Sequence, residues 1–473
     1  MEDQGFGYIE EEMRDIVRRY ERMRKNNENF FFDVAEFETI IDYYLELNDV
    51  NYAFEAAESA SAQHPASSSI QLRKVKVLID KGRPVDALKI TKVIEKIEPS
   101  NYEVFLLKGA ALGMLGDLNG TRKYFDIALS VDETEEISIL LNITEILNNL
   151  NHYGLLTKYL LRLVELEPEY SSHLYDLAFA YEKLGDFKKS IQYYKKYLDE
   201  EPYSDNAWYN LGLLYTREGM RKKALDAYEY AIAVNPENFF AIFNMANILS
   251  KEGKYMEALE AYLHYLEFEE ESSEAMTYAA ECYEKTGDRG KALKMYNEAI
   301  DLDPDFSEPW YGIGLLLLHE KPQESIKYFR KAVTLKSDEP EYWYYLSEAY
   351  YYCHNLKESF RSLVESVTVN PYYDNAWLKM GKIIIAGGYY RHAAGLLEKG
   401  MKVIGDVHGI RYILASTYLF SGNKDMFITH LEKALTDSPG YYRFFRSLFP
   451  DKMIDKRMQK IIRKNIKKLP YDS

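Results

Sequence analysis

Cysteine is nearly absent from this chain of 473 residues, which contains Cys282 and Cys353 and no others. Two such cysteines provide neither the framework of a disulfide-stapled domain nor the ligand spacing of a zinc site. The sequence therefore predicts no metal and no cofactor. It favours a reducing compartment, and we expect a cytoplasmic protein.

Long apolar runs are also missing. The longest, from Ile313 to Leu318, is far shorter than the ~20 residues that span a bilayer. The acidic start of the chain, MEDQGFGYIEEEM, lacks the apolar core of a secretory signal. With 47% hydrophobic and 28% charged residues, the composition is typical of a folded globular chain.

Acidic residues outnumber basic ones, 75 against 59, and the net charge of −16 argues against general binding to nucleic acid. The exception is the segment 441–469, which carries ten Lys and Arg residues and two Asp residues. Nucleic acid and membrane are therefore unlikely partners for most of the chain, and any such contact would involve this basic segment.

Catalytic signatures do not occur. The sequence contains no phosphate-binding Walker loop, no HExxH and no GxSxG, and its nine histidines are scattered. We expect no enzymatic activity.

What the chain does contain is a repeat of about 34 residues. The segment 205–236, DNAWYNLGLLYTREGMRKKALDAYEYAIAVNP, shows the pattern, and one step from Gly219 and Ala224 leads to Gly253 and Ala258. Such self-similarity indicates a repeat architecture. Twelve units begin at residues 34, 68, 102, 137, 171, 205, 239, 273, 307, 340, 374 and 408.

Each unit has the apolar spacing of two helices. In the sixth unit Trp208, Leu211 and Tyr215 fall on one face of a first helix, and Ala224 and Tyr228 on one face of a second. The fifteenth position, where the first helix stops, is Gly in eight units and Asn in two, the residues that tolerate a left-handed cap. Small residues at the eighth and twentieth positions mark close helix crossings, where a larger side chain would overpack by ~1–3 kcal/mol.

These units resemble the tetratricopeptide repeat (TPR). The resemblance implies an all-α fold: a right-handed TPR superhelix, or α-solenoid, of about twelve helix-turn-helix repeats, whose first helices line a concave groove. We expect an N-terminal capping helix region over residues 1–33, the solenoid over 34–441 and a basic C-terminal capping helix region over 442–473. The residues that match the family signature are Trp208, Leu211, Gly212, Tyr215, Ala224, Tyr228, Ala231 and Pro236.

By this resemblance, positions two, five, nine and twelve of each repeat face the groove, and we call them the groove positions. In repeats five to twelve the fifth position is aromatic in six of eight cases, which suggests a row of anchors for a partner segment. Asn210 and Asn244 lie beside this row with Asn247 close by, and their amides could hold the backbone of an extended peptide. The aromatic residues at this position are Tyr175, Tyr209, Phe243, Tyr311, Tyr344 and Tyr412, of which the first five are the predicted anchors.

The groove positions of all repeats carry eleven acidic residues and two lysines. Clamps that hold the C-terminal carboxylates of chaperones in this family need Lys or Arg there, so chaperone tails are not expected partners. An acidic, aromatic groove suits a basic or neutral segment. The alternative interpretation, a family preference for Tyr beside a solvated acidic face, stays open. Six of the acids lie in repeats eight to ten: Glu274, Glu281, Glu284, Glu308, Glu341 and Glu348.

We therefore expect a non-enzymatic protein–protein interaction scaffold that captures a basic or neutral peptide or helix segment of another protein. One alternative is a self-associating assembly subunit, a homo-oligomer in which the basic C-terminal helix contacts the acidic groove of a second copy. The other alternative is an adaptor that uses this helix to contact a membrane or nucleic acid.

Overall fold

The computed structural model describes residues 3–26, 28, 30–405, 410–437 and 460. These residues form α-helices joined by short turns, together with one 3-10 turn, η1 (Glu133–Glu135), and the described part of the chain contains no strand. The chain forms two compact units, Met1–Asn235 and Pro236–Ser473.

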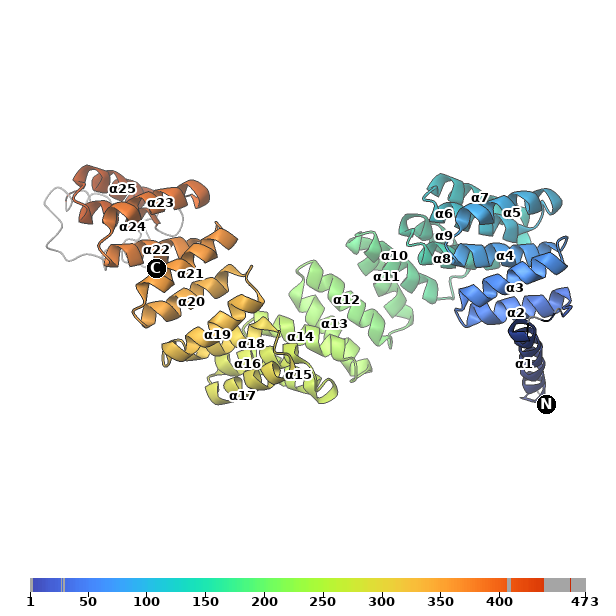
Figure 1. Cartoon of the computed structure of the whole chain (residues 1–473), viewed down its shortest axis with the longest axis horizontal. Coiled ribbons are helices and arrows are strands. Elements are labelled where there is room, and N and C mark those ends of the chain that lie inside the picture. The colour runs from blue at the N-terminus through green and yellow to red at the C-terminus, as the bar shows by residue number, and fades with distance from the viewer. Residues whose placement is uncertain (1–2, 27, 29, 406–409, 438–459, 461–473) are drawn as a thin grey trace. The chain divides into compact units, whose positions relative to one another are not determined.

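In the first unit a single helix precedes six helix pairs, and the two helices of each pair lie side by side (Figure 1). Even-numbered helices open the repeats and odd-numbered helices close them. The helices are α1 (Asp3–Asn26), α2 (Val34–Glu46), α3 (Val50–Gln63), α4 (Ser68–Asp80), α5 (Pro84–Ile97), α6 (Tyr102–Met114), α7 (Leu118–Val131), α8 (Glu136–Asn149), α9 (Tyr153–Leu166), α10 (Ser172–Lys183), α11 (Phe187–Glu200), α12 (Asp205–Arg217) and α13 (Arg221–Val234).

The second unit continues the same pattern with six further pairs in its described residues. The all-α fold of about twelve helix pairs expected from the sequence is confirmed. The helices are α14 (Phe239–Lys251), α15 (Tyr255–Phe268), α16 (Ser273–Thr286), α17 (Arg289–Leu302), α18 (Ser307–Leu317), α19 (Pro322–Leu335), α20 (Pro340–Tyr352), α21 (Leu356–Val369), α22 (Asp374–Ala386), α23 (Tyr390–Ile404), α24 (Ile410–Phe420) and α25 (Lys424–Asp437).

The turn inside most repeats depends on one left-handed residue. Gly219 has φ 72°, and the two predicted asparagines, Asn48 and Asn151, have φ 56° and 57°. His354 occupies the same place with φ 56°, which the sequence pattern did not predict. The repeat that begins at residue 307 differs, because it is one residue shorter and Lys321 has φ −137°.

Close helix crossings explain the small residues of the repeat. A Cβ atom added to Gly212 would lie 2.5 Å from Cε1 of Tyr228, and one added to Gly314 would lie 2.6 Å from Cε1 of Phe329. Ala224, at the twentieth position of the sixth repeat, is fully buried. Tyrosine and phenylalanine rings of the second helices therefore fill the space that Gly and Ala leave at the crossings.

The four tryptophans share one contact. Each stands at the fourth position of its repeat, and its indole Nε1 donates to the backbone carbonyl six residues earlier, at 2.9–3.1 Å. These hydrogen bonds fix the turn that enters a repeat to the first helix of that repeat. The tryptophans are Trp208, Trp310, Trp343 and Trp377.

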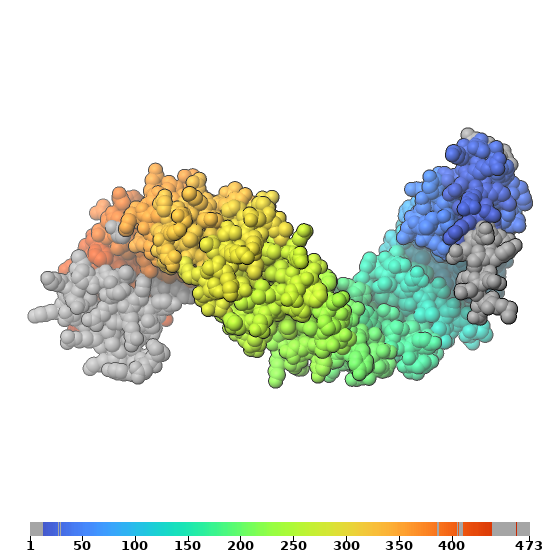
Figure 2. Space-filling view, turned by 90° about the horizontal axis from the view of Figure 1, so that it is seen from below, coloured from blue at the N-terminus to red at the C-terminus, as the bar shows by residue number. Residues whose placement is uncertain are grey.

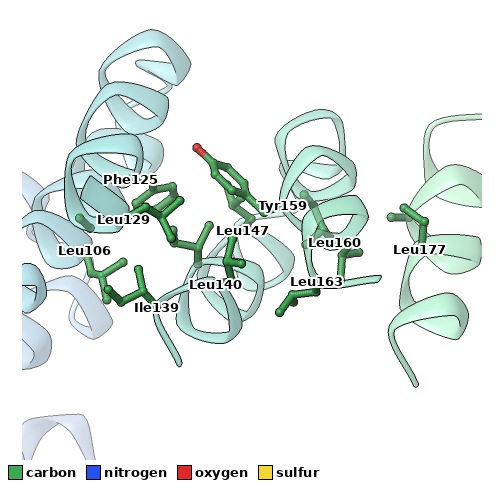
Figure 3. Close-up of a cluster of buried hydrophobic side chains, with 14 of the residues drawn as sticks. Leu106, Phe125, Leu129, Ile139, Leu140, Leu147, Tyr159, Leu160, Leu163 and Leu177 are labelled. Carbon is green, nitrogen blue, oxygen red and sulfur yellow. The ribbon is translucent and has the colours of Figure 1, made fainter. Parts of the chain in front are cut away.

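Side chains from successive helices share one core rather than forming separate pairs. In the first unit a buried cluster takes residues from α6 through α10, and Figure 3 shows Phe125, Leu140, Leu160 and Leu177 among them. The space-filling view accordingly shows successive segments of a unit in contact (Figure 2). Each repeat is stabilised mainly by its neighbours, as in other solenoids.

At the start of the chain α1 packs on the first repeat. Val17 and Tyr20 are buried in one cluster with Phe37 and Ile40 of α2. At the other end, the predicted basic capping region 442–473 lies outside the described residues, apart from Lys460.

We expect Ala224→Leu to lower the free energy of unfolding by roughly 1–3 kcal/mol, because the added atoms enter a fully packed crossing. Chemical denaturation measures the effect. Ala233→Leu makes the same change at an exposed position of α13 and should have little effect. Equal destabilisation by both variants would contradict the assignment of the crossing.

Candidate functional site

Two predicted groove residues of the first unit, Tyr175 and Asn210, are in direct contact. Asn210 Nδ2 donates to the Tyr175 hydroxyl at 2.9 Å and to the Tyr194 hydroxyl at 3.2 Å. Burial raises the pKa of Tyr175, which keeps this hydroxyl protonated. Tyr209, also a predicted anchor, is half-buried beside Tyr228, with ring centroids 6.1 Å apart.

The other predicted asparagines lie on α14 in the second unit, and they too make contacts within the protein. Asn244 Nδ2 donates to the backbone carbonyl of Phe240 at 2.8 Å, and Asn247 Oδ1 accepts from the Tyr262 hydroxyl at 2.6 Å. Half-buried polar groups commonly satisfy their hydrogen bonds inside the fold. The role expected for Asn210 and Asn244 stays a prediction, and any peptide would meet amide nitrogens that already donate within this protein.

Phe243, at the fifth position of its repeat, lies among three tyrosines. Its ring centroid is 5.0 Å from that of Tyr265, 5.9 Å from that of Tyr262 and 6.1 Å from that of Tyr278. Phe243 remains half-buried, so part of its ring is accessible. Its neighbours come from α15 and α16, so two consecutive repeats hold the ring in place.

Tyr311 and Tyr344 belong to a second aromatic group. Tyr311 stacks on Tyr342 with centroids 4.6 Å apart, and its ring also meets Tyr345 at 5.7 Å. Tyr345 in turn lies 5.3 Å from Tyr344, which meets Tyr373 at 5.7 Å. The rings of two successive repeats, on α18, on α20 and at Tyr373 immediately before α22, therefore form a continuous network.

Two of the six predicted acids form ion pairs with lysines. Glu308 meets Lys336 at 3.1 Å, and Glu348 meets Lys379 at 2.7 Å. The second pair is well covered, since 12% and 14% of the two side chains are exposed. The count of acidic groove residues therefore overstates the negative charge of the groove, because two of the carboxylates are paired with lysines. The count of groove lysines missed both partners because Lys336 follows α19 and Lys379 occupies the sixth position of its repeat.

Tyrosine hydroxyls donate to three of the remaining acids. Tyr278 donates to Glu274 Oε1 at 3.0 Å, and the hydroxyls of Tyr296 and Tyr311 bond to two further carboxylates. A hydrogen bond from a tyrosine hydroxyl stabilises a carboxylate but leaves its negative charge in place. Among these six residues the negative charge is therefore concentrated at Glu274, Glu284 and Glu341, with a partial contribution from Glu281 near neutral pH.

Glu281 has the most altered acidity of these groups. Loss of contact with water, together with the negative charge of Glu284, raises the pKa of Glu281 from the ordinary value of 4.5 to about 7. The side chain still reaches solvent. Near neutral pH the protonated and ionised forms of this carboxyl group are therefore both populated.

This shift predicts a pH dependence of stability. Because the pKa of Glu281 is higher in the folded state, the charged form disfavours folding, and stability is lost as pH rises from about 4.5 through about 7. We expect Glu281→Gln to gain thermal stability over the wild type at pH ~8 but little at pH ~5, with a modest size because the group is solvent-accessible. Thermal unfolding at both pH values tests this, with Glu260→Gln, exposed on α15, as the control. A gain independent of pH would contradict the assignment.

A pocket of about 570 Å³ opens on the first unit, and sequence reasoning did not identify it. Tyr175 and Asn210 contribute to it, as do residues at positions five, nine and twelve of the fourth and fifth repeats. These positions were expected to face the groove, but the pocket depends on α9 side chains that periodicity alone does not place there. The lining comprises Leu141, Thr144, Glu145, Asn148, Leu156, Leu160, Tyr175, Asp176, Phe179, Glu182, Lys183 and Asn210.

In the described part of the chain, no group of three His, Cys, Asp or Glu side chains is arranged to hold a metal ion. None of the helices described combines the length and apolarity needed to cross a membrane. Cys282 is a buried free thiol, and Cys353 is a half-buried one.

Solved structures with a similar helical arrangement include a tetratricopeptide repeat protein from Parabacteroides merdae, with 18% identity, a TM-score of 0.43, and coverage of 52% of this chain and 98% of that one. Yeast Tom70 has 14% identity and a TM-score of 0.41, with 92% and 98% of the two chains covered. YrrB, described as a TPR protein with an unusual peptide-binding site, has 18% identity and a TM-score of 0.33, with 39% and 95% covered. A search of curated proteins finds no match.

Family models match three stretches of the sequence. The middle TPR-like domain of cilia and flagella-associated protein 70 matches residues 174–280, and the tetratricopeptide repeat itself matches 274–306 and 408–439. These stretches coincide with helix pairs of both units. Together with the left-handed turns and small crossing residues of the repeats, these matches show that the chain contains tetratricopeptide repeats in both units.

Proposed function

We propose that this protein is a non-enzymatic scaffold that captures a basic or neutral peptide or helix of another protein on the groove positions of α14, α16, α18 and α20. TPR proteins serve in general as protein–protein interaction scaffolds, and solenoids offer extended surfaces for that purpose. The finer assignment depends on the aromatic and acidic side chains of the second unit.

The observation that carries the proposal is the set of half-buried aromatic rings held by their neighbours. Phe243 is fixed by Tyr262, Tyr265 and Tyr278, and Tyr311 by Tyr342 and its surroundings. A ring that is already immobile loses little entropy when a partner covers its accessible part. Such rings suit the role of anchor better than mobile surface side chains do.

The remaining carboxylates define the chemistry of the partner. Glu274, Glu281, Glu284 and Glu341 favour a segment that carries Lys or Arg, or at least no net negative charge. A segment that ends in a carboxylate would meet repulsion here, so we do not propose chaperone tails as partners.

Affinity capture from a lysate, followed by mass spectrometry, would provide a partner for kinetic tests. We expect Glu281→Lys combined with Glu341→Lys to slow association on the order of tenfold at low salt and to weaken its salt dependence, because the two charges attract the partner before contact. Surface plasmon resonance at several salt concentrations measures both effects.

The control changes the net charge equally but on a different face. Glu260→Lys and Glu267→Lys lie at exposed positions of α15, a second helix, and should leave association nearly unchanged. If the two double variants slow association equally, net charge alone is responsible and the groove assignment fails.

A further inference from the structure

The pocket of the first unit has a floor of hydrocarbon. Leu156 and Leu160 of α9 lie at its base and are only 3% and 2% exposed. Leu141 of α8 reaches into it and is 45% exposed, and Phe179 of α10 adds an aromatic ring. A surface of this kind covers the aliphatic part of a long side chain.

The walls of the pocket are acidic. Glu145, Asp176 and Glu182 contribute carboxylates, and Lys183 is the one cationic residue of the lining. The surrounding protein raises the pKa of Asp176 by desolvation, although the residue is exposed at the surface of the chain. A cation entering here would stabilise the ionised form of Asp176.

Lys183 already shows how the pocket accommodates an ammonium group. Its Nζ lies 4.7 Å from the centroid of the Phe179 ring, within cation–π distance. The three carboxylates exceed this single ammonium by two charges. The pocket therefore holds unbalanced negative charge next to an apolar floor.

A second hollow of about 450 Å³ adjoins the pocket, because both are lined by Leu141 and Glu145. It adds Glu135 and the partly exposed Ile137. The two hollows share side chains of α8, and each combines apolar with acidic lining residues.

We propose that the 570 Å³ pocket receives a lysine or arginine side chain of a bound protein segment, whose preceding apolar residue covers Leu141 and Ile137. The apolar floor takes the aliphatic stem, and Glu145, Asp176 and Glu182 take the cationic end. This assignment rests on the proposed scaffold function and adds to it a specific side chain and a separate contact on the first unit.

The test uses the full chain with 13C-labelled leucine methyl groups and three peptides, acetyl-Ala-Ile-Xaa-Ala-Ala-amide with Xaa as Lys, norleucine or Glu. We expect the Lys peptide to shift the methyl resonances of Leu156 and Leu160 and to bind about fivefold more tightly than the norleucine peptide, the effect of about one ion pair. The Glu peptide should bind more weakly than both.

A charge-matched pair of variants identifies the carboxylates. Glu145→Gln with Glu182→Gln should remove the preference for Lys over norleucine, while Glu165→Gln with Glu200→Gln, at exposed positions of second helices, should retain it. Equal binding of the Lys and norleucine peptides, shifts confined to other methyl groups, or a preference that survives in the first variant would each overturn the proposal.

The two proposals fail separately. If the Lys peptide shows no preference while Glu281→Lys with Glu341→Lys still slows capture of the natural partner, the pocket assignment is wrong and the scaffold function stands. If the Lys peptide binds as expected while the second-unit variants have no effect, the pocket stands and the partner site proposed on the second unit is wrong.

Discussion

Lys379→Met should destabilise the second unit by about 3 kcal/mol, the scale observed when one partner of a covered ion pair is removed. The ammonium of Lys379 lies 2.7 Å from Glu348 and 3.8 Å from the centroid of the Tyr351 ring. Methionine retains much of the volume but leaves the Glu348 carboxylate without its cation. Denaturant unfolding would report the loss, and amide exchange should place it in α20–α22.

Two further variants test this explanation. Lys379→Met combined with Glu348→Gln removes the stranded charge and should recover most of the stability, since a neutral pair of similar size is often tolerated. Lys379→Arg keeps the charge and should cost less than methionine. If the combined variant is as unstable as Lys379→Met alone, packing rather than charge accounts for the loss.

Removing two aromatic anchors together should weaken partner binding most strongly. We expect Phe243→Ala with Tyr311→Ala to reduce affinity roughly 100-fold, chiefly through faster dissociation, at ~1–2 kcal/mol for each anchor. The reason is that both rings are held in place before the partner arrives. Dissociation rates of the captured partner provide the measurement.

Loss of packing must be separated from loss of contact in this experiment. Tyr328 lies on α19, a second helix, and its half-buried ring is 6.0 Å from that of Trp310. Tyr328→Ala therefore disturbs the fold without changing a groove position. The double variant and this control should both remain folded by circular dichroism at the assay temperature. Comparable loss of binding in Tyr328→Ala would mean that the groove rings contribute stability rather than contact.

The helix pairs could be predicted because their determinants are local and periodic. Gly219 ends a first helix, and Gly212 and Ala224 mark a crossing, wherever they recur along the chain. His354 escaped the pattern because histidine is a less frequent left-handed residue than Gly or Asn. The repeat spacing predicted a turn at residue 354, although histidine itself did not indicate a left-handed residue.

The chemistry of the candidate site could be predicted only in part, because its contacts join different helices. Periodicity placed Glu348 on the groove face, but the lysine that neutralises it comes from the next repeat. Asn210 likewise looked available until its two tyrosine partners, on α10 and α11, were located. A residue count along one face records which groups are present but not which of them bind one another.

The recurring left-handed turn also determines where the chain can be cut and rejoined. Gly253 and Gly287 stand one repeat apart, with φ 79° and 93°. A segment exchanged between them therefore has a left-handed glycine at both ends. Whole repeats can therefore be duplicated, deleted or swapped as cassettes at these joints. The repeat that begins at residue 307 is the exception, because Lys321, with φ −137°, offers no equivalent joint.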